Sequence, residues 1–90
     1  MDERTSVPTM YVPPEGEWDK VNNIFTFHPV QGNQAQRYEY LRSVGRMLAH
    51  DILAMTPKSR EQSVAITKLQ EVIMWANAAI AINEKSEENK

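Results

Sequence analysis

One short stretch carries side chains suited to binding an anion. Lys58, Ser59 and Arg60 follow one another where a helix is expected to begin. A helix N-terminus offers free backbone N–H groups and partial positive charge, and an adjacent arginine adds a forked donor. The stretch is therefore a candidate phosphate site, although an ordinary helix cap beside a solvated arginine accounts for the same residues.

A second stretch is rich in aromatic side chains. Phe25 and Phe27 flank Thr26, and Tyr11 lies in a proline-rich segment before them. Aromatic planes can stack on nucleobases while a hydroxyl donates or accepts a hydrogen bond. The alternative is that Phe25, Phe27 and Trp18 pack a short helix against the rest of the chain. Tyr11 is harder to explain as part of a core.

Catalytic chemistry has little support in the sequence. His28 and His50 are the only histidines, cysteine is absent, and no HExxH, P-loop or GxGxxG pattern occurs. His50 and Asp51 are neighbours on an expected helix, so their side chains point about 100° apart and do not share a face. We therefore expect no enzyme activity, no metal site and no cofactor.

Composition narrows the range of partners. The chain has 90 residues, no cysteine and a formal net charge of −2. The acids gather at the ends, so residues 20–82 are mildly cationic while residues 1–19 are strongly acidic. That distribution suits a small anion better than duplex nucleic acid. No apolar run is long enough for a membrane span, and we expect no membrane partner.

The spacing of apolar residues is helical throughout. Trp18, Val21, Ile24 and Phe25 indicate a short helix that ends before His28 and Pro29. A long helix is expected from about residue 33, with Asn33 as its N-cap, to residue 55; its apolar stripe is Tyr38, Leu41, Val44, Leu48, Ile52 and Met55. A second long helix is expected after a capping box, in which Ser59 caps an amide and Gln62 reaches back, and runs to about residue 83.

These patterns predict an all-α protein: a short N-terminal helix plus an antiparallel pair of long helices. We expect residues 1–17 to form an extended proline-rich arm, residues 18–84 a single helical domain, and residues 85–90 a frayed acidic tail.

The run from Val72 to Ile82 is apolar at every position except Asn77. A helix that is apolar all round must be covered all round, and two other helices are too few to do that. We expect another copy of the chain to supply the cover, in a symmetric homo-oligomer, with Trp75, Asn77, Ala78 and Ile80 at the interface. The alternatives are a compact monomer covered by its own N-terminal arm, and a helical interaction module that docks a host protein.

Several segments together resemble a known family. They are Phe25-Thr26-Phe27-His28-Pro29, Pro57-Lys58-Ser59-Arg60-Glu61, and the run Val64 to Glu71 that leads into Met74-Trp75-Ala76-Asn77-Ala78-Ala79-Ile80-Ala81. They are similar to the phage anti-CBASS sponges, which sequester the cyclic nucleotide messengers of bacterial antiviral signalling. The resemblance covers roughly residues 22–84, and its last motif is the most specific.

The resemblance implies a helical homohexamer in the cytoplasm of an infected bacterium. It implies that the protein binds cyclic dinucleotides, such as 3′,3′-cGAMP, and cyclic trinucleotides, such as cA3, without cleaving them. The implied trinucleotide residues are Arg60, Thr26 and Ser59. The implied dinucleotide residues are Tyr11, Lys20 and Phe25, although the family's lysine is expected where this chain has Asn23 and Ile24.

Overall fold

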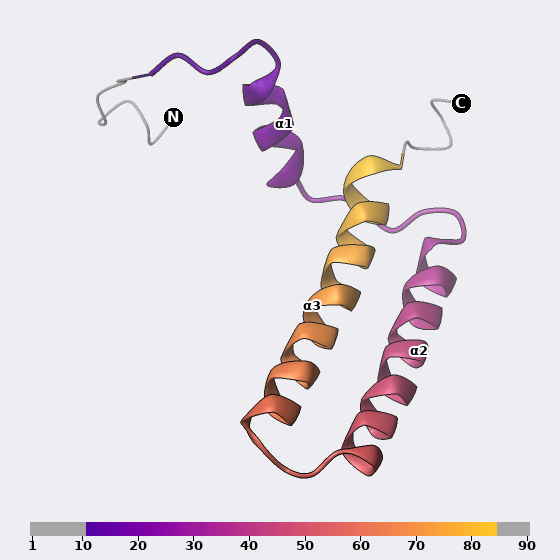
Figure 1. Ribbon diagram of the computed structural model, residues 1–90. Helices are drawn as coiled ribbons and strands as arrows, with labels where there is room; N and C mark the ends of the chain where they lie inside the picture. Colours follow the sequence, from indigo (N-terminus) through magenta and orange to yellow (C-terminus); the bar gives the residue numbers. More distant parts are fainter. Residues whose placement is uncertain (1–10, 85–90) are drawn as a thin grey trace.

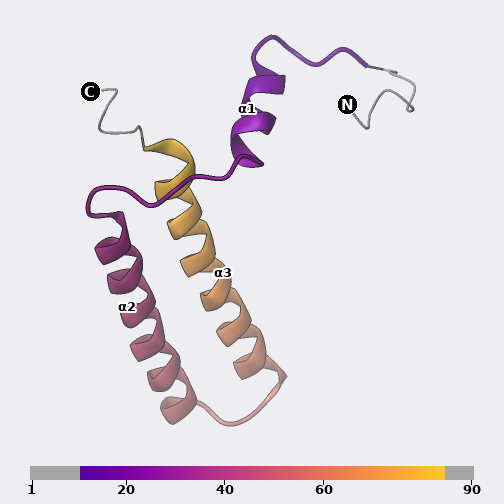
Figure 2. The same ribbon diagram turned by 180° about the vertical axis from the view of Figure 1, so that it is seen from behind.

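The fold is a long helical hairpin preceded by a short helix. A computed structural model describes residues 11–84 and shows three helices and no strand among them: α1 (Glu17–Ile24), α2 (Gln34–Met55) and α3 (Arg60–Asn83). Helices α2 and α3 run antiparallel side by side, joined by a short turn, and α1 lies beyond the C-terminal end of α3 (Figures 1 and 2). The expected all-α architecture is confirmed.

The predicted ends of the two long helices are confirmed, whereas α1 ends at Ile24, before the predicted end at Phe27, and some capping contacts also differ. Asn33 is the N-cap residue of α2 and makes no side-chain cap; its Oδ1 instead accepts a hydrogen bond from Arg37 Nε at 3.0 Å. Ser59 does cap α3, its Oγ accepting from the Gln62 amide at 3.1 Å. The prediction that the Gln62 side chain completes the capping box is wrong. Gln62 Nε2 donates instead to the carbonyl and hydroxyl oxygens of Thr56, at 3.0 Å each.

The hairpin is held at its middle by a close helix approach. Gly45 on α2 is buried against Ile73 on α3, and a Cβ built on Gly45 would lie 2.8 Å from Ile73 Cγ1. Real carbon atoms do not approach that closely, so the absence of a side chain at Gly45 lets the two helix axes come together.

A polar cluster closes the open end of the hairpin. Glu84, which follows α3, accepts hydrogen bonds from Arg37 Nη1 at 2.6 Å, Arg37 Nη2 at 2.7 Å and Gln34 Nε2 at 3.0 Å. Gln34 is the most buried polar residue described, with 3% of its surface exposed. The hydrogen bonds to Glu84 raise the pKa of the Arg37 guanidinium above its ordinary value. The charged form of this arginine is therefore favoured by the fold.

The described residues contain no buried apolar side chain. The Cα radius of gyration is 18.7 Å, against about 12 Å for a compact domain of this length. Large apolar side chains are exposed on both long helices, including Tyr40, Met47, Val72 and Trp75. Among residues 11–84, no helix combines the length and the apolar character needed to cross a lipid bilayer.

Candidate functional site

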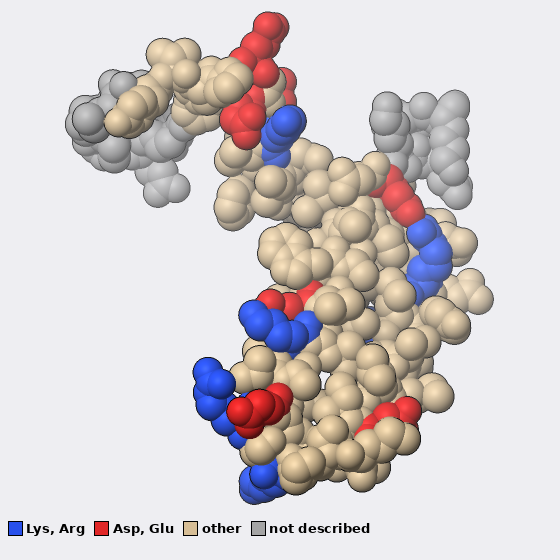
Figure 3. Space-filling model, viewed as in Figure 1, with Lys and Arg blue, Asp and Glu red and all other residues tan. Residues whose placement is uncertain are grey.

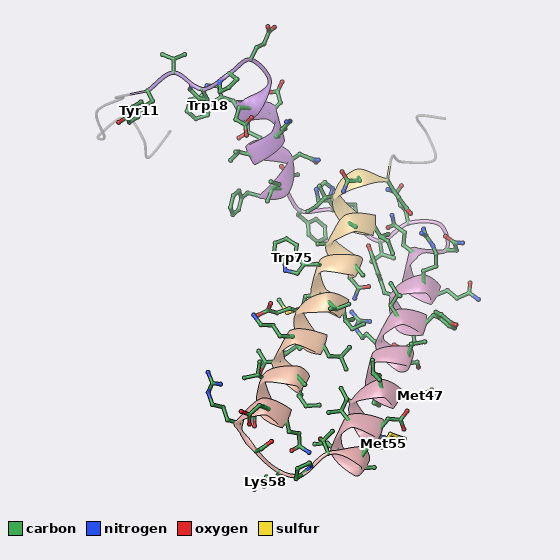
Figure 4. The ribbon with its side chains drawn as sticks, in the orientation of Figure 1. Tyr11, Trp18, Met47, Met55, Lys58 and Trp75 are labelled. Atoms are coloured by element: carbon green, nitrogen blue, oxygen red, sulfur yellow. The ribbon has the colours of Figure 1, made fainter. Side chains whose placement is uncertain are left out.

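The first candidate site is the turn that leads into α3. Arg60 is the first residue of α3, its side chain is exposed, and Lys58 is exposed just before it, at the hairpin turn in Figure 4. Ser59 Oγ donates to Pro57 O at 3.0 Å and accepts from the Gln62 amide, so its proton is already used. The amides of Arg60 and Glu61 lie in the first helical turn, where the helix supplies no acceptor. This end therefore offers one guanidinium and two backbone donors to an anion.

The second candidate site is the aromatic segment that follows α1. Thr26 Oγ1 donates to Asn22 O at 2.6 Å, which leaves its lone pairs to accept a hydrogen bond. Phe25 and Phe27 are each 83% exposed, so the two phenylalanines do not staple α1 to the hairpin within one protomer. His28 Nε2 lies 2.8 Å from Asn23 O; a carbonyl only accepts, so this nitrogen carries the proton. The segment thus has a hydrogen-bonded backbone turn and free aromatic faces.

Thr26 and Arg60 lie at opposite ends of the hairpin. Asn23 Nδ2 donates to Ile82 O at 3.0 Å, which places the end of α1 beside the C-terminal end of α3. Arg60 begins the same helix, and 24 helical residues extend about 36 Å. Thr26 and Arg60 of one protomer therefore do not reach the same small ligand.

The residues expected to bind a dinucleotide are spread over the N-terminal part of the chain. Tyr11 is 81% exposed and lies at the far end of the extended segment before α1 (Figure 4). Lys20 lines a groove of about 560 Å³ between α1 and α3, together with Ile24 and Trp75. Phe25 is exposed at the end of α1. In one protomer these side chains do not form an enclosed pocket.

The residues expected at an interface occupy different sides of α3. Trp75 is 73% exposed and points away from α2, whereas Met47, which is 66% exposed, lies on the outer side of α2 (Figure 4). Asn77 lies instead in grooves shared with α2, and its Oδ1 is a buried oxygen without a hydrogen-bond partner in the described structure. Ala78 and Ile80 are half-buried.

Sequence reasoning missed two features. Helical spacing places Arg37 and Arg42 outside the apolar stripe of α2 and predicts no partner for either. In the structure Arg37 closes the hairpin, and Arg42 lines two grooves that also contain Asn77. The partner of Arg37, Glu84, is distant in sequence, so helical spacing holds no signal for the pair. Residues 11–84 contain no group of three His, Asp or Glu side chains arranged to hold a metal ion.

Most of the chain matches the model of a known protein family. Residues 19–81, from the middle of α1 to nearly the end of α3, match the family model described as Acb2/Tad1, hairpin domain. The chain belongs to this family. The Acb2/Tad1 family comprises anti-CBASS cyclic-oligonucleotide sponges, which sequester their ligands and are not enzymes. No curated protein and no solved structure matches the chain.

The Acb2/Tad1 match contains most of the expected site residues. Lys20, Phe25, Thr26, Ser59 and Arg60 lie inside it, as do all four expected interface residues. Tyr11 lies before it. The family assignment therefore bears on the hairpin and the aromatic segment, and does not extend to the arm that carries Tyr11.

Proposed function

We propose that the protein binds cyclic dinucleotides and cyclic trinucleotides without cleaving them, and so blocks CBASS signalling. The match of residues 19–81 to the Acb2/Tad1 hairpin domain carries this proposal. Sequestration needs affinity and copy number and does not need turnover. The site of action would be the cytoplasm of the infected bacterium, where the messengers are made.

We further propose that the protein works as a symmetric homo-oligomer, a hexamer by family resemblance. Trp75 on α3 and Met47 on α2 are both exposed and lie on opposite sides of the hairpin. One two-fold interface covers one of these sides, so covering both requires a second interface and an assembly larger than a dimer. Burial in such an assembly would supply the apolar core that residues 11–84 lack within one protomer.

The proposed trinucleotide site lies between copies. Because Thr26 and Arg60 lie at opposite ends of the hairpin, a ligand that contacts both must take them from different protomers. Ser59 would contribute through the helix start that it caps. Several cationic helix starts around one axis repel one another unless an anion lies between them, so a ring of phosphates would stabilise the arrangement.

The proposed dinucleotide site uses Tyr11, Lys20 and Phe25. Tyr11 and Phe25 are exposed enough to stack on bases, and Lys20 supplies a positive charge near the end of α1. Where the family's lysine is expected, this chain has Asn23, whose amide is engaged by Ile82 O. We therefore expect the trinucleotide to bind more tightly than the dinucleotide.

The expected affinity is sufficient for sequestration. Stacking contributes about 1–3 kcal/mol per base, and each charge-assisted phosphate contact contributes about 1.5–3 kcal/mol. Three bases and three phosphates together contribute about 8–18 kcal/mol. Nanomolar affinity corresponds to about 12 kcal/mol after the cost of association, so it requires contacts near the upper end of this range and a preformed pocket that keeps that cost low.

Calorimetry with 3′,3′-cGAMP and cA3 on the full chain tests the proposal. We expect saturable nanomolar binding, and we expect each ligand to be recovered intact after the protein is denatured. Loss of the intact ligand would identify a nuclease. A monodisperse 10.4 kDa monomer that binds neither ligand would favour a module that docks a host protein instead.

The domain limits are proposed as an arm over residues 1–17, a helical unit over residues 18–84 and a tail over residues 85–90. Residues 1–10 and the whole tail lie outside the described residues.

A further inference from the structure

A groove on one face of the hairpin is lined by two arginines. This arginine groove, of about 750 Å³, lies between α2 and α3; its polar side chains are Arg42, Arg46, Gln70 and Asn77. Its volume falls within the range of small-molecule sites. No carboxylate lines it. The groove is therefore suited in size and charge to a small anion.

The two arginines are spaced to share one anion. Arg42 and Arg46 are four residues apart on α2, so their side chains leave the same face of the helix, and their charges repel each other. Within the described residues Arg46 forms no ion pair. Arg42 Nη1 lies 3.8 Å from Glu39 Oε1, and both of these side chains are exposed. A phosphate between them would relieve the repulsion and accept hydrogen bonds from both guanidinium groups.

The surroundings favour an anion that bears a flat ring. Leu69, Ile73 and Met74 give the arginine groove an apolar wall. A second groove of about 370 Å³, the aromatic groove, adjoins it and is lined by Tyr38 and His28. Arg42, Met74 and Asn77 line both grooves. A phosphate held by the arginines would therefore leave room for an attached base beside Tyr38.

Asn77 stands where the two grooves meet. Its Oδ1 is buried and accepts no hydrogen bond in the described structure. A buried acceptor without a donor costs free energy, and the amino group of a purine is a donor of the required kind. Rotation of the Asn77 side chain toward the groove would allow that contact.

We propose that these adjoining grooves form a second, intraprotomer site for a nucleotide with an accessible phosphate. The phosphate lies between Arg42 and Arg46, and the base lies in the aromatic groove near Tyr38 and Asn77. The site shares no residue with either proposed cyclic-nucleotide site. It does not rest on the proposed sponge function.

The test is calorimetry of 5′-AMP binding to the full-length Arg60→Ala variant, in which the anion site at the start of α3 is removed. We expect saturable binding that weakens about tenfold in Arg42→Gln and about tenfold in Arg46→Gln, each added to that background, because each loses one charge-assisted fork. Lys68→Gln, which removes one positive charge outside the groove, is the matched control and should leave the affinity unchanged. Adenosine should not bind, and inorganic phosphate should bind about tenfold more weakly than 5′-AMP.

Four outcomes would overturn the proposal. The first is no saturable binding of 5′-AMP up to about 5 mM, and the second is equal weakening by Lys68→Gln and Arg46→Gln. The third is equal affinity for phosphate and 5′-AMP, which would remove the base from the site. The fourth is a change of oligomeric mass in Arg46→Gln, which would show that the arginines pair with acids of another copy. None of these outcomes bears on binding of cA3 or 3′,3′-cGAMP to the unaltered protein.

Discussion

The Arg37 guanidinium binds both carboxylate oxygens of Glu84, with Nη1 to Oε2 at 2.6 Å and Nη2 to Oε1 at 2.7 Å. One residue lies near the start of α2 and the other directly follows α3, so the pair fastens the open end of the hairpin. The opposite end is closed by the chain itself (Figure 1).

Removing this fork should loosen the hairpin. Glu84→Gln is expected to lower the Tm measured by circular dichroism, because it leaves Arg37 without its anionic partner. Glu39→Gln is the matched control: it removes a carboxylate that lies 3.8 Å from Arg42, and it should leave the Tm nearly unchanged. Equal Tm values for the two variants would contradict a fastening role for Glu84.

The same pair gives an expectation for pH. The fold raises the pKa of Arg37, so its contribution is fully present below the ordinary arginine pKa and is lost only as the pH rises through the still higher folded value. The Tm difference between the unaltered protein and Arg37→Gln should therefore be the same at pH 7 and pH 10. A difference that shrinks over this interval would argue against a charged Arg37 in the fork.

A methyl group at position 45 should be poorly tolerated. Gly45→Ala places a carbon about 2.8 Å from Ile73 Cγ1, and overpacking of this kind costs about 1–3 kcal/mol, while the gain in helix propensity is at most about 1 kcal/mol. We expect a net loss of about 1 kcal/mol in urea unfolding. Adding Ile73→Ala should cost less in the Gly45→Ala background than in the unaltered protein. Strict additivity would show that the two side chains do not collide.

Arg60 is expected to control trinucleotide binding. Arg60→Ala should weaken cA3 binding at least 100-fold in calorimetry, because a symmetric site loses several guanidinium contacts at once. Light scattering should show an unchanged oligomeric mass, since Arg60 is exposed at a helix start and lines no described groove. Lys68→Ala, on the same helix, is the control for loss of one charge. Equal cA3 affinity in Arg60→Ala and the unaltered protein would rule out this site.

A mixing experiment tests whether the trinucleotide site is shared between copies. Thr26→Val and Arg60→Ala should each lose cA3 binding as pure proteins. After unfolding and refolding as a mixture, the two should recover part of it, because some sites combine Thr26 of one copy with Arg60 of another. Recovery is not possible if each site takes both residues from one chain, so the mixture would then stay inactive.

Trp75 is expected to hold the assembly together. It is 73% exposed on the outer side of α3, and aromatic anchors of interfaces often contribute about 2 kcal/mol or more. Trp75→Ala should therefore lower the oligomeric mass in a concentration-dependent way during analytical ultracentrifugation. Loss of helical circular dichroism together with mass would mean that the protomer does not persist alone, and an unchanged mass would place the interface elsewhere.

Charge is distributed unevenly along the protomer. Acidic side chains gather around α1, which carries Glu17 and Asp19 in its first turn, whereas the turn that begins α3 carries Lys58 and Arg60 (Figure 3). Copies that run in opposite directions would bring the acidic end of one near the basic end of the next. Association of that kind should weaken as the ionic strength rises.

The sequence by itself determined the helices and the residue that begins each of the two long ones. Apolar spacing, the proline at position 57 and the Ser59 cap act within a few residues of chain, so the extents of α2 and α3 and the place of Arg60 follow from local sequence alone. The local motifs also predicted that the chain belongs to the sponge family, and the family match confirmed this prediction.

Only the tertiary structure decided which of these residues meet. Arg37 pairs with Glu84 because antiparallel packing brings the start of α2 beside the end of α3, and Asn33 Oδ1 accepts a hydrogen bond from that arginine instead of capping the helix. Phe25 and Phe27 remained exposed because α1 lies beyond the hairpin and offers them no partner. The family resemblance assigns Thr26 and Arg60 to the same ligand, but the structure places them at opposite ends of α3. Local spacing determines which side chains lie on each face of a helix. The distance between two residues across the fold depends instead on packing between segments that are far apart in the chain.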